Sequence, residues 1–250
     1  MPFIRRIVVA LSVSAVMWSA SAGVAAASSK LASLTPSLNT VTTTMPTGSP
    51  VARVNVQNDN GAVVFRAGSP GTVTRTEAWN FVEPSYSQSL SDDGTLTIRA
   101  RCPSDVPDND CSVSLVITVP PTVAIRASTI NGNVEVAGFQ SPTVAATSTN
   151  GNVNISLDVP PAGFPSPTVA AKSTNGDVNV SLESVPTKLL MSTINGRIHS
   201  TVPAGAYALS TATVNGQVTT VTGIEDDPDP AASVALSADT INGDITLRGV

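Results

Sequence analysis

Apolar and polar residues alternate on both sides of an Asn-Gly dipeptide that recurs along most of the chain. With the Asn of each copy counted as zero, the residue six positions before it is aliphatic and the residue three positions after it is β-branched. Val169 and Val178 occupy these two positions around Asn175. Period-two alternation on each side of a turn is typical of half-buried strands. Each copy therefore predicts two short strands joined at Asn-Gly.

The copies are regularly spaced. Asn-Gly occurs seven times, and the last six copies follow one another at intervals of 19, 25, 20, 20 and 27 residues, with Asn60-Gly61 standing apart upstream. A period near 20 residues is typical of stacked supersecondary units. The six regular copies form a predicted turn ladder of Asn131, Gly132, Asn150, Gly151, Asn175, Gly176, Asn195, Gly196, Asn215, Gly216, Asn242 and Gly243.

Two arrangements fit this repeat. In one, Asn-Gly closes a type I′ hairpin and the chain is an antiparallel β-meander or sandwich. In the other, Asn-Gly is a corner of a parallel β-solenoid whose coils stack about 4.8 Å apart. Thr or Ser recurs two residues before each regular Asn, and such position-specific likeness favours stacking of like on like. We therefore expect an all-β, single-stranded parallel β-solenoid (β-helix) of about seven coils over residues 51–250.

The stretch 71–120 breaks the period. Strand-like runs occupy residues 73–82, 96–101 and 112–119, with Asp93-Gly94 as a turn. They predict an antiparallel hairpin insertion that covers the N-terminal end of the solenoid and protects it from edge-to-edge pairing. The opposite end is expected to be uncapped, because the sequence stops at Val250 directly after a strand. This C-terminal coil is therefore a candidate for self-association.

The N-terminus predicts export. Arg5 and Arg6 precede an apolar run and then small residues, which is the pattern of a signal peptide over residues 1–27. The run is too short for a transmembrane helix, and no later stretch could span a bilayer. Residues 28–50 are rich in Ser, Thr and Pro, and predict a flexible lead-in. We expect a secreted, periplasmic or extracellular protein of the cell envelope, in which Cys102 and Cys111 form a disulfide.

The charge balance excludes some partners. The chain has 13 basic and 18 acidic side chains, and loss of Arg5 and Arg6 with the leader would leave 11 basic ones and a net charge of −7. An acidic surface argues against nucleic acid or anionic lipid as the main partner.

Several features together resemble a known family. A leader, Trp79, the two cysteines, a strand ending in Val119-Pro120 and coils such as Thr129-Ile-Asn-Gly-Asn-Val occur in that order. In this the chain resembles the bacterial adhesin-like domains of unknown function, an auto-transporter-head-like family of β-solenoids. The resemblance covers residues 51–250 and implies export and a β-solenoid, but it supplies no catalytic residues. The chain departs from the family in its long Pro-rich and acidic insertions.

Candidate catalytic or metal-binding groups are few. Asp177 and Asp244 share the position after Gly, but on sequence order they lie three coils apart, about 14 Å, which is too far for a glycosidase pair. His199 is a lone outward histidine. Two acidic loops could attract calcium but lack a calcium-loop spacing, so we interpret them as solvated turns; they contain Asp105, Asp108 and Asp110, and Glu225, Asp226, Asp227 and Asp229. No catalytic, cofactor-binding or metal residue is predicted.

The leading functional hypothesis is a non-enzymatic, adhesin-like structural or interaction module of the cell envelope. It would offer rows of Asn, Thr and Ser to an unidentified surface carbohydrate or protein. The alternatives are a polysaccharide-acting β-helix enzyme, which would need carboxylates clustered on adjacent coils, and a sensor domain of the envelope.

Overall fold

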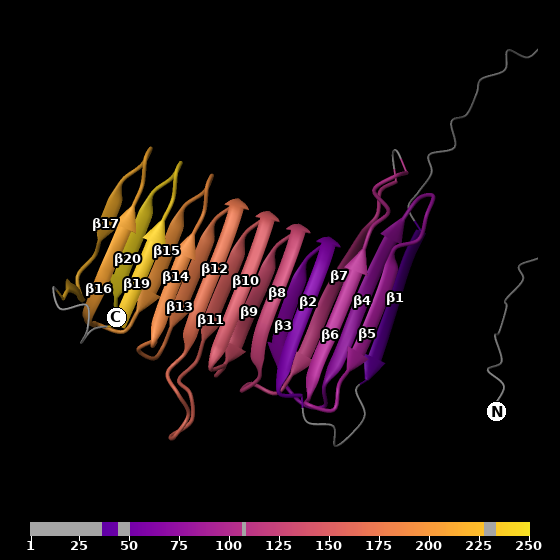
Figure 1. The fold of residues 1–250 in the computed structure, drawn as a ribbon, viewed down its shortest axis with the longest axis horizontal. Coiled ribbons are helices and arrows are strands. Elements are labelled where there is room, and N and C mark those ends of the chain that lie inside the picture. The colour runs from indigo at the N-terminus through magenta and orange to yellow at the C-terminus, as the bar shows by residue number, and fades with distance from the viewer. Residues whose placement is uncertain (1–36, 45–50, 107–108, 228–233) are drawn as a thin grey trace, which may run out of the picture. The chain divides into compact units, whose positions relative to one another are not determined.

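The computed structural model describes residues 37–44, 51–106, 109–227 and 234–250, all of which belong to one compact unit, Leu34–Val250 (Figure 1). These residues form twenty β-strands and no helix, so the all-β prediction is confirmed. The predicted leader, residues 1–27, lies outside the described residues, as do Asp108 and Asp229.

The strands make two ten-stranded sheets. Sheet A runs, in spatial order, through β1 (Ser37–Thr44), β4 (Thr72–Trp79), β7 (Ser112–Val119), β3 (Val63–Ala67), β9 (Val134–Phe139), β11 (Val153–Leu157), β13 (Val178–Leu182), β15 (Ile198–Val202), β20 (Ile245–Gly249) and β17 (Val218–Thr220). Sheet B runs through β18 (Ile224–Asp226), β16 (Gly205–Ala212), β19 (Val234–Asp239), β14 (Lys188–Ser192), β12 (Thr168–Asn175), β10 (Thr143–Asn150), β8 (Ala124–Asn131), β2 (Arg53–Asn60), β6 (Thr95–Arg101) and β5 (Ser85–Leu90).

Equivalent positions of successive repeats pair in parallel. Val144 of β10 lies opposite Ile125 of β8 on one side and Val169 of β12 on the other. In sheet A, Val153 of β11 lies in the same way between Val134 and Val178. The chain passes from one sheet to the other at each strand from β7 to β17. This parallel register excludes the antiparallel β-meander for the repeat strands.

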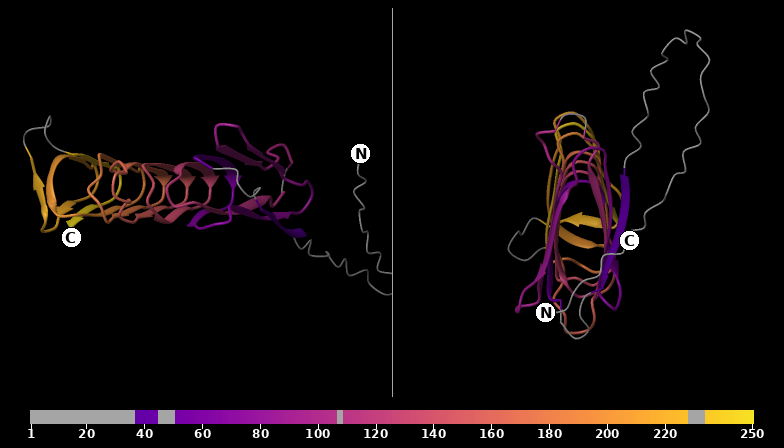
Figure 2. Two further views of the ribbon diagram at one scale, coloured as in Figure 1. Left: turned by 90° about the horizontal axis from the view of Figure 1, so that it is seen from below. Right: turned by 90° about the vertical axis from the view of Figure 1, so that its right-hand side faces the viewer.

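The core lies between the two sheets, which face each other (Figure 2). Alternate residues of each strand point inward, because side chains of a strand alternate between its two faces. Most inward positions are Val, Ile, Leu or Ala and are buried to a few per cent exposure or less. Phe65 of β3 and Phe139 of β9 add an edge-to-face ring pair with centroids 6.5 Å apart. This apolar burial stabilises the stack, although the edge strand β17 is exposed.

The N-terminal end of the stack combines parallel and antiparallel pairing. β7 is parallel to β3 and β6 is parallel to β2, whereas β4 and β5 are antiparallel to β7 and β6. The predicted runs 73–82, 96–101 and 112–119 correspond to β4, β6 and β7. Residues 85–90 also form a strand, β5, which the pattern did not predict because it alternates Ser with few large apolar residues.

Part of the predicted flexible lead-in is also a strand. Residues 37–44 form β1, which pairs antiparallel with β4 over its full length. For these residues the prediction of a flexible lead-in is wrong. The reason is that the segment contains Val41 and several Thr, and β-branched residues favour extended backbone once a partner strand is present.

The spatial order of the repeats differs from their order in the sequence. β19 lies between β14 and β16, and β20 lies between β15 and β17. The C-terminal strand is therefore paired on both sides, and the prediction that the C-terminal coil is the uncapped one is wrong. The edges at this end are β17 and β18. The physical reason is that all repeats share one pattern, so the last repeat fits between two others as well as after them.

Candidate functional site

The Asn-Gly turns line up along one edge of the stack, and their asparagines bond to one another. In each neighbouring pair, Nδ2 of one side-chain amide donates to Oδ1 of the next. The bonds join Asn131 to Asn60, Asn150 to Asn131, Asn175 to Asn150, Asn195 to Asn175, Asn242 to Asn195 and Asn215 to Asn242, over 2.5–2.8 Å. Because each interior amide uses one donor and one acceptor on its neighbours, only half of its bonding capacity faces solvent.

The glycines of these turns also lie in close backbone contact with one another. A Cβ added to Gly151, whose φ is +156°, would lie 2.2 Å from the carbonyl oxygen of Gly132. No other residue fits such a contact between backbones. The turn edge is therefore built for stacking.

The row of Thr and Ser two residues before each Asn lies inside the stack. Ser148 and Ser173 are 1% and 2% exposed, and their hydroxyls donate to the carbonyl oxygens of Gly132 and Gly151 at 2.7 and 2.8 Å. Thr193 donates in the same way to Gly176. The hypothesis that this row is offered to a ligand is therefore wrong, since all six hydroxyls are bonded to glycine carbonyl oxygens and every residue of the row except Thr213 is buried.

Asp177 and Asp244 have backbone partners. Oδ1 of Asp177 accepts the N–H of Arg197 at 2.8 Å, and Oδ1 of Asp244 accepts that of Gln217 at 3.0 Å. Since β20 is inserted beside β15, the two carboxylates are separated by two strand spacings, about 10 Å, and not by the three expected. This distance is at the upper limit for an inverting glycosidase pair. Arg197 occupies the equivalent position on the repeat between them.

A shallow hollow of about 400 Å³ lies on the outer face of sheet A, over β9, β11, β13 and β15. Two rows in register line it: Glu135, Asn154, Asn179 and His199, and beside them Ala137, Ser156, Ser181 and Thr201. Nδ2 of Asn179 donates to Oδ1 of Asn154 at 2.8 Å, and Glu135 pairs with Arg66 at 3.4 Å. The structure thus places the lone His199 in a polar row. The sequence signal for this row is the polar residue four positions after each Asn.

The acidic loops have local hydrogen bonds. Asp226 accepts the N–H of Leu209 at 3.2 Å, and Asp110 accepts Nδ2 of Asn80 at 2.9 Å. Among the described residues, no three His, Cys, Asp or Glu side chains lie close enough together to hold a metal ion.

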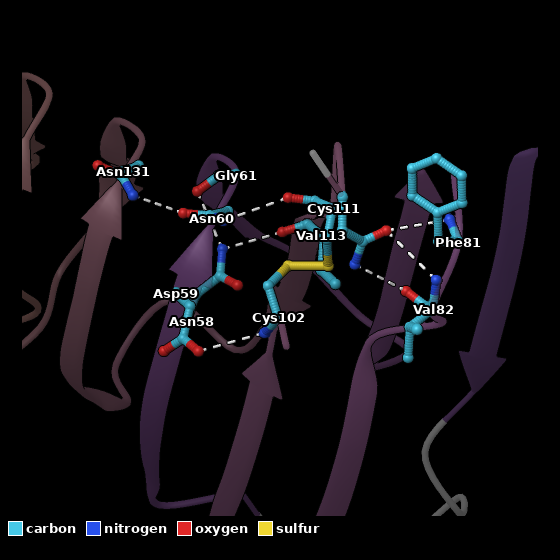
Figure 3. Close-up of a disulfide and its surroundings, with 11 residues drawn as sticks. Asn58, Asp59, Asn60, Gly61, Phe81, Val82, Cys102, Cys111, Val113 and Asn131 are labelled. Atoms are coloured by element: carbon cyan, nitrogen blue, oxygen red, sulfur yellow. Dashed lines mark hydrogen bonds between the residues drawn. A yellow bond between two sulfur atoms is a disulfide. The ribbon is translucent and has the colours of Figure 1, made fainter. Parts of the chain in front are cut away.

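The disulfide between Cys102 and Cys111 is confirmed, and it lies at the N-terminal end of the ladder (Figure 3). Cys102 directly follows β6 of sheet B and Cys111 directly precedes β7 of sheet A, so the disulfide links the two sheets covalently. Asn60, the first asparagine of the ladder, donates Nδ2 to the carbonyl oxygen of Cys111 at 3.2 Å. The amide row therefore ends on the disulfide loop.

None of the described segments forms a helix that is long and apolar enough to cross a membrane.

No protein-family model and no curated protein matches the chain. Among solved structures, it is similar to a protein of Clostridium sporogenes provisionally named a cell adhesion protein, with 11% identity, a TM-score of 0.47, and coverage of 86% of this chain and 100% of that one. A provisionally named adhesin of Bacteroides fragilis has 12% identity, a TM-score of 0.34, and coverage of 86% and 97%. At these identities and TM-scores the likenesses do not identify a function.

Proposed function

We propose that the protein is a non-enzymatic, exported module of the cell envelope, and that residues 51–250 form a parallel β-solenoid whose coils are the Asn-Gly repeats. The in-register amide ladder carries this proposal, because it joins equivalent residues of seven repeats. Signal-peptide removal before Ser28 and export from the cell interior belong to the proposal. Sequencing the N-terminus of the exported protein tests them, and an intact residue 1–27 leader would contradict them.

The polar groups of the turn edge support a scaffold role. The amides, hydroxyls and carboxylates of this edge bond to neighbouring repeats. In one such repeat, the side chains of Asn175, Ser173 and Asp177 all make bonds of this kind. Hydrogen bonds that hold the backbone in place leave these groups little freedom to move protons or attack a substrate.

The hollow on sheet A is the proposed ligand surface, and a carbohydrate is the proposed ligand. The Asn154 amide retains hydrogens, and the Ser156 and Ser181 hydroxyls are exposed beside it. Amides and hydroxyls bind sugar hydroxyls as both donors and acceptors. Because rigid strands hold them about 4.8 Å apart, a chain-like ligand meets a preorganised row and loses less entropy on binding.

A glycan and matrix-protein array with the purified protein, expressed with its own leader, tests this function. We expect a glycan to bind, and N154A/N179A to lose at least about tenfold in affinity, the loss expected for one or two hydrogen bonds. The matched control, T219A/T246A, alters outward residues beyond the hollow and should bind normally. Binding only to proteins, or no loss in N154A/N179A, would overturn the proposed ligand surface.

A polysaccharide-acting enzyme is the second candidate, because Asp177 and Asp244 are about 10 Å apart, close to the spacing of the carboxylates of an inverting hydrolase. An inverting hydrolase would release reducing ends from a glycan, and both D177N and D244N would abolish the release. We expect no release by the unaltered protein. If the unaltered protein hydrolyses a glycan and both variants lose this activity, the protein is a hydrolase and not a binding module.

A further inference from the structure

A second, cationic hollow of about 900 Å³ lies on the outer face of sheet B, over β6, β2, β8 and β10, which can be located in Figure 1. Its lining contains three arginines, Arg53, Arg99 and Arg126, and no carboxylate. Uncharged polar residues and alanines make up most of the rest, among them Asn55, Gln57, Thr97, Ser128, Thr143 and Thr147. A smaller hollow of about 280 Å³ shares Arg99 and adds Arg101. On an acidic chain with a net charge of −5, this is a local concentration of positive charge.

The arginines converge from three adjacent strands. Arg126 of β8 lies opposite Asn55 of β2, and Arg99 of β6 lies opposite Gln57 of β2. Along the strand direction, Arg53 of β2 is offset by two residues from Arg126 and by four from Arg99, which sets the three Cα atoms roughly 8–14 Å apart. All three side chains are exposed and project from a face whose opposite side is the buried core. The strands therefore hold the Cα atoms of the three arginines at fixed spacings.

No carboxylate in the described part of the chain forms an ion pair with these arginines. The ion pairs found there join Arg66 to Glu135 and Arg75 to Glu77. Nε of Arg99 donates to Oε1 of Gln57 at 3.1 Å, which orients the guanidinium and leaves its terminal amino groups free for a ligand.

Asp93 and Asp59, on or beside the strands of this face, accept hydrogen bonds from other groups. Asp93, near Arg53, accepts bonds from the Ser91 and Thr95 hydroxyls and the Thr95 N–H. Asp59 accepts the N–H of Cys102. Asp93 attracts Arg53 electrostatically, whereas Arg99 and Arg126 have no ion-pair partner among the described residues.

We propose that this hollow binds an acidic polysaccharide. The planar guanidinium groups bind carboxylate or sulfate groups through paired hydrogen bonds. Hydroxyls such as those of Thr97 and Ser128, and the Asn55 amide, bind the sugar hydroxyls between the charged groups. The lining of the 900 Å³ hollow has no aromatic side chain on which a nucleic acid base could stack. This site is distinct from the hollow on sheet A and does not depend on the function proposed for that surface.

Binding to four immobilised polymers tests the site: polygalacturonate, which carries carboxylates; heparin, which carries sulfates; neutral dextran; and DNA, in single- and double-stranded form. We expect the purified protein to bind polygalacturonate or heparin, to ignore dextran, and to bind less at high salt, because the contacts are charged. The first two polymers distinguish a carboxylate ligand from a sulfate ligand. No binding to either, or tighter binding to DNA than to both, overturns the proposal.

Matched charge variants locate the binding. R99Q/R126Q should weaken binding by about tenfold or more, since it removes the charge-assisted hydrogen bonds of two guanidinium groups. R197Q/R248Q removes the same charge away from the hollow and should change affinity by less than about twofold. R99K/R126K keeps the charge without the paired geometry and should bind weakly. Equal losses in the two glutamine variants would show a general charge effect and overturn the site. If the double variant unfolds, single R126Q decides the question, because no hydrogen bond or ion pair of this guanidinium is found among the described residues.

Discussion

Asn150 donates Nδ2 to Oδ1 of Asn131 over 2.7 Å, although 19 residues separate them in the chain. The same bond joins Asn242 to Asn195, which are 47 residues apart. The ladder therefore follows the spatial order of the repeats and not their order in the sequence. One dipeptide thus supplies both the turn and the contact that holds neighbouring turns together.

Removal of one amide from the middle of the ladder should destabilise the fold. N175A loses the bonds to Asn150 and from Asn195, and we expect a loss of about 1–3 kcal/mol at roughly 0.5–1.5 kcal/mol per bond. N215A is the matched control, because Asn215 ends the ladder and makes one such bond. Urea unfolding should show about half the loss in N215A. Equal effects of the two substitutions would contradict a stabilising ladder.

Methyl groups on the glycine row should be tolerated poorly. In G151A the new Cβ would lie 2.2 Å from the Gly132 carbonyl oxygen, so the repeats must move apart. We expect a loss of about 1–3 kcal/mol or more, as for other overpacked sites. G205A is the control, since the nearest atom to its Cβ is Cε2 of Tyr207 at 3.8 Å. Thermal melting of the two variants measures the difference, and similar melting temperatures would speak against close stacking.

The disulfide should contribute to stability through the unfolded state. It closes a loop with a sequence separation of 9, for which chain entropy predicts about 2–3 kcal/mol. C102S/C111S should lose roughly that amount in urea unfolding. Reducing agent should lower the stability of the unaltered protein to the same level and leave the variant unchanged. A variant as stable as the parent would show that the strand pairing alone fixes this end.

Stability should fall at alkaline pH because of the two tyrosines. Burial raises the pKa of Tyr86 and of Tyr207 above the ordinary value of 10.0; at Tyr86, nearby Arg75 lowers the pKa and Glu77 raises it to smaller extents. Phenols of the unfolded chain ionise first as pH rises past about 10, so this stability is present below pH 10 and is lost toward the higher folded pKa values.

Phenolate absorbance, titrated in native buffer and in denaturant, measures these pKa values directly. Both tyrosines should ionise at higher pH in the native protein. Y207F removes one of the two signals, together with the hydroxyl bond from Tyr207 to the Pro203 carbonyl oxygen at 2.6 Å. Coincident native and denatured titrations would refute the raised pKa values.

Truncation after Asp227 tests the unexpected order of the repeats. It removes β19 and β20, so β16 keeps only β18 and β17 loses its partner strand. We expect residues 203–227 to become sensitive to limited proteolysis, while β8 to β13 stay protected, because unpaired strands open easily. Continued protection of residues 203–227 would mean that β16 and β17 had moved next to β14 and β15.

The candidate sites could be predicted only in part. The polar row with Asn154, Asn179 and His199 follows from the repeat, because equivalent outward positions stack. The cationic hollow does not follow, since Arg99 lies in the aperiodic stretch 71–120 and Arg53 and Arg126 lie on opposite sides of that stretch. Only the parallel pairing of β2 with both β6 and β8 brings the three together.

The sequence by itself determined the strands of the repeat, their turns and the disulfide partners, because alternation, Asn-Gly and cysteine content act locally or through simple pairing rules. The tertiary structure alone decided which repeats are neighbours. Leu189 pairs with Leu236 and not with Leu209 of the next repeat in sequence. Repeats with one shared pattern have nearly equal local preferences, so packing of the whole stack selects among them. The tertiary structure also decided that β1 and β5 are strands. Their alternation is weak, and they extend because a partner strand satisfies their backbone hydrogen bonds.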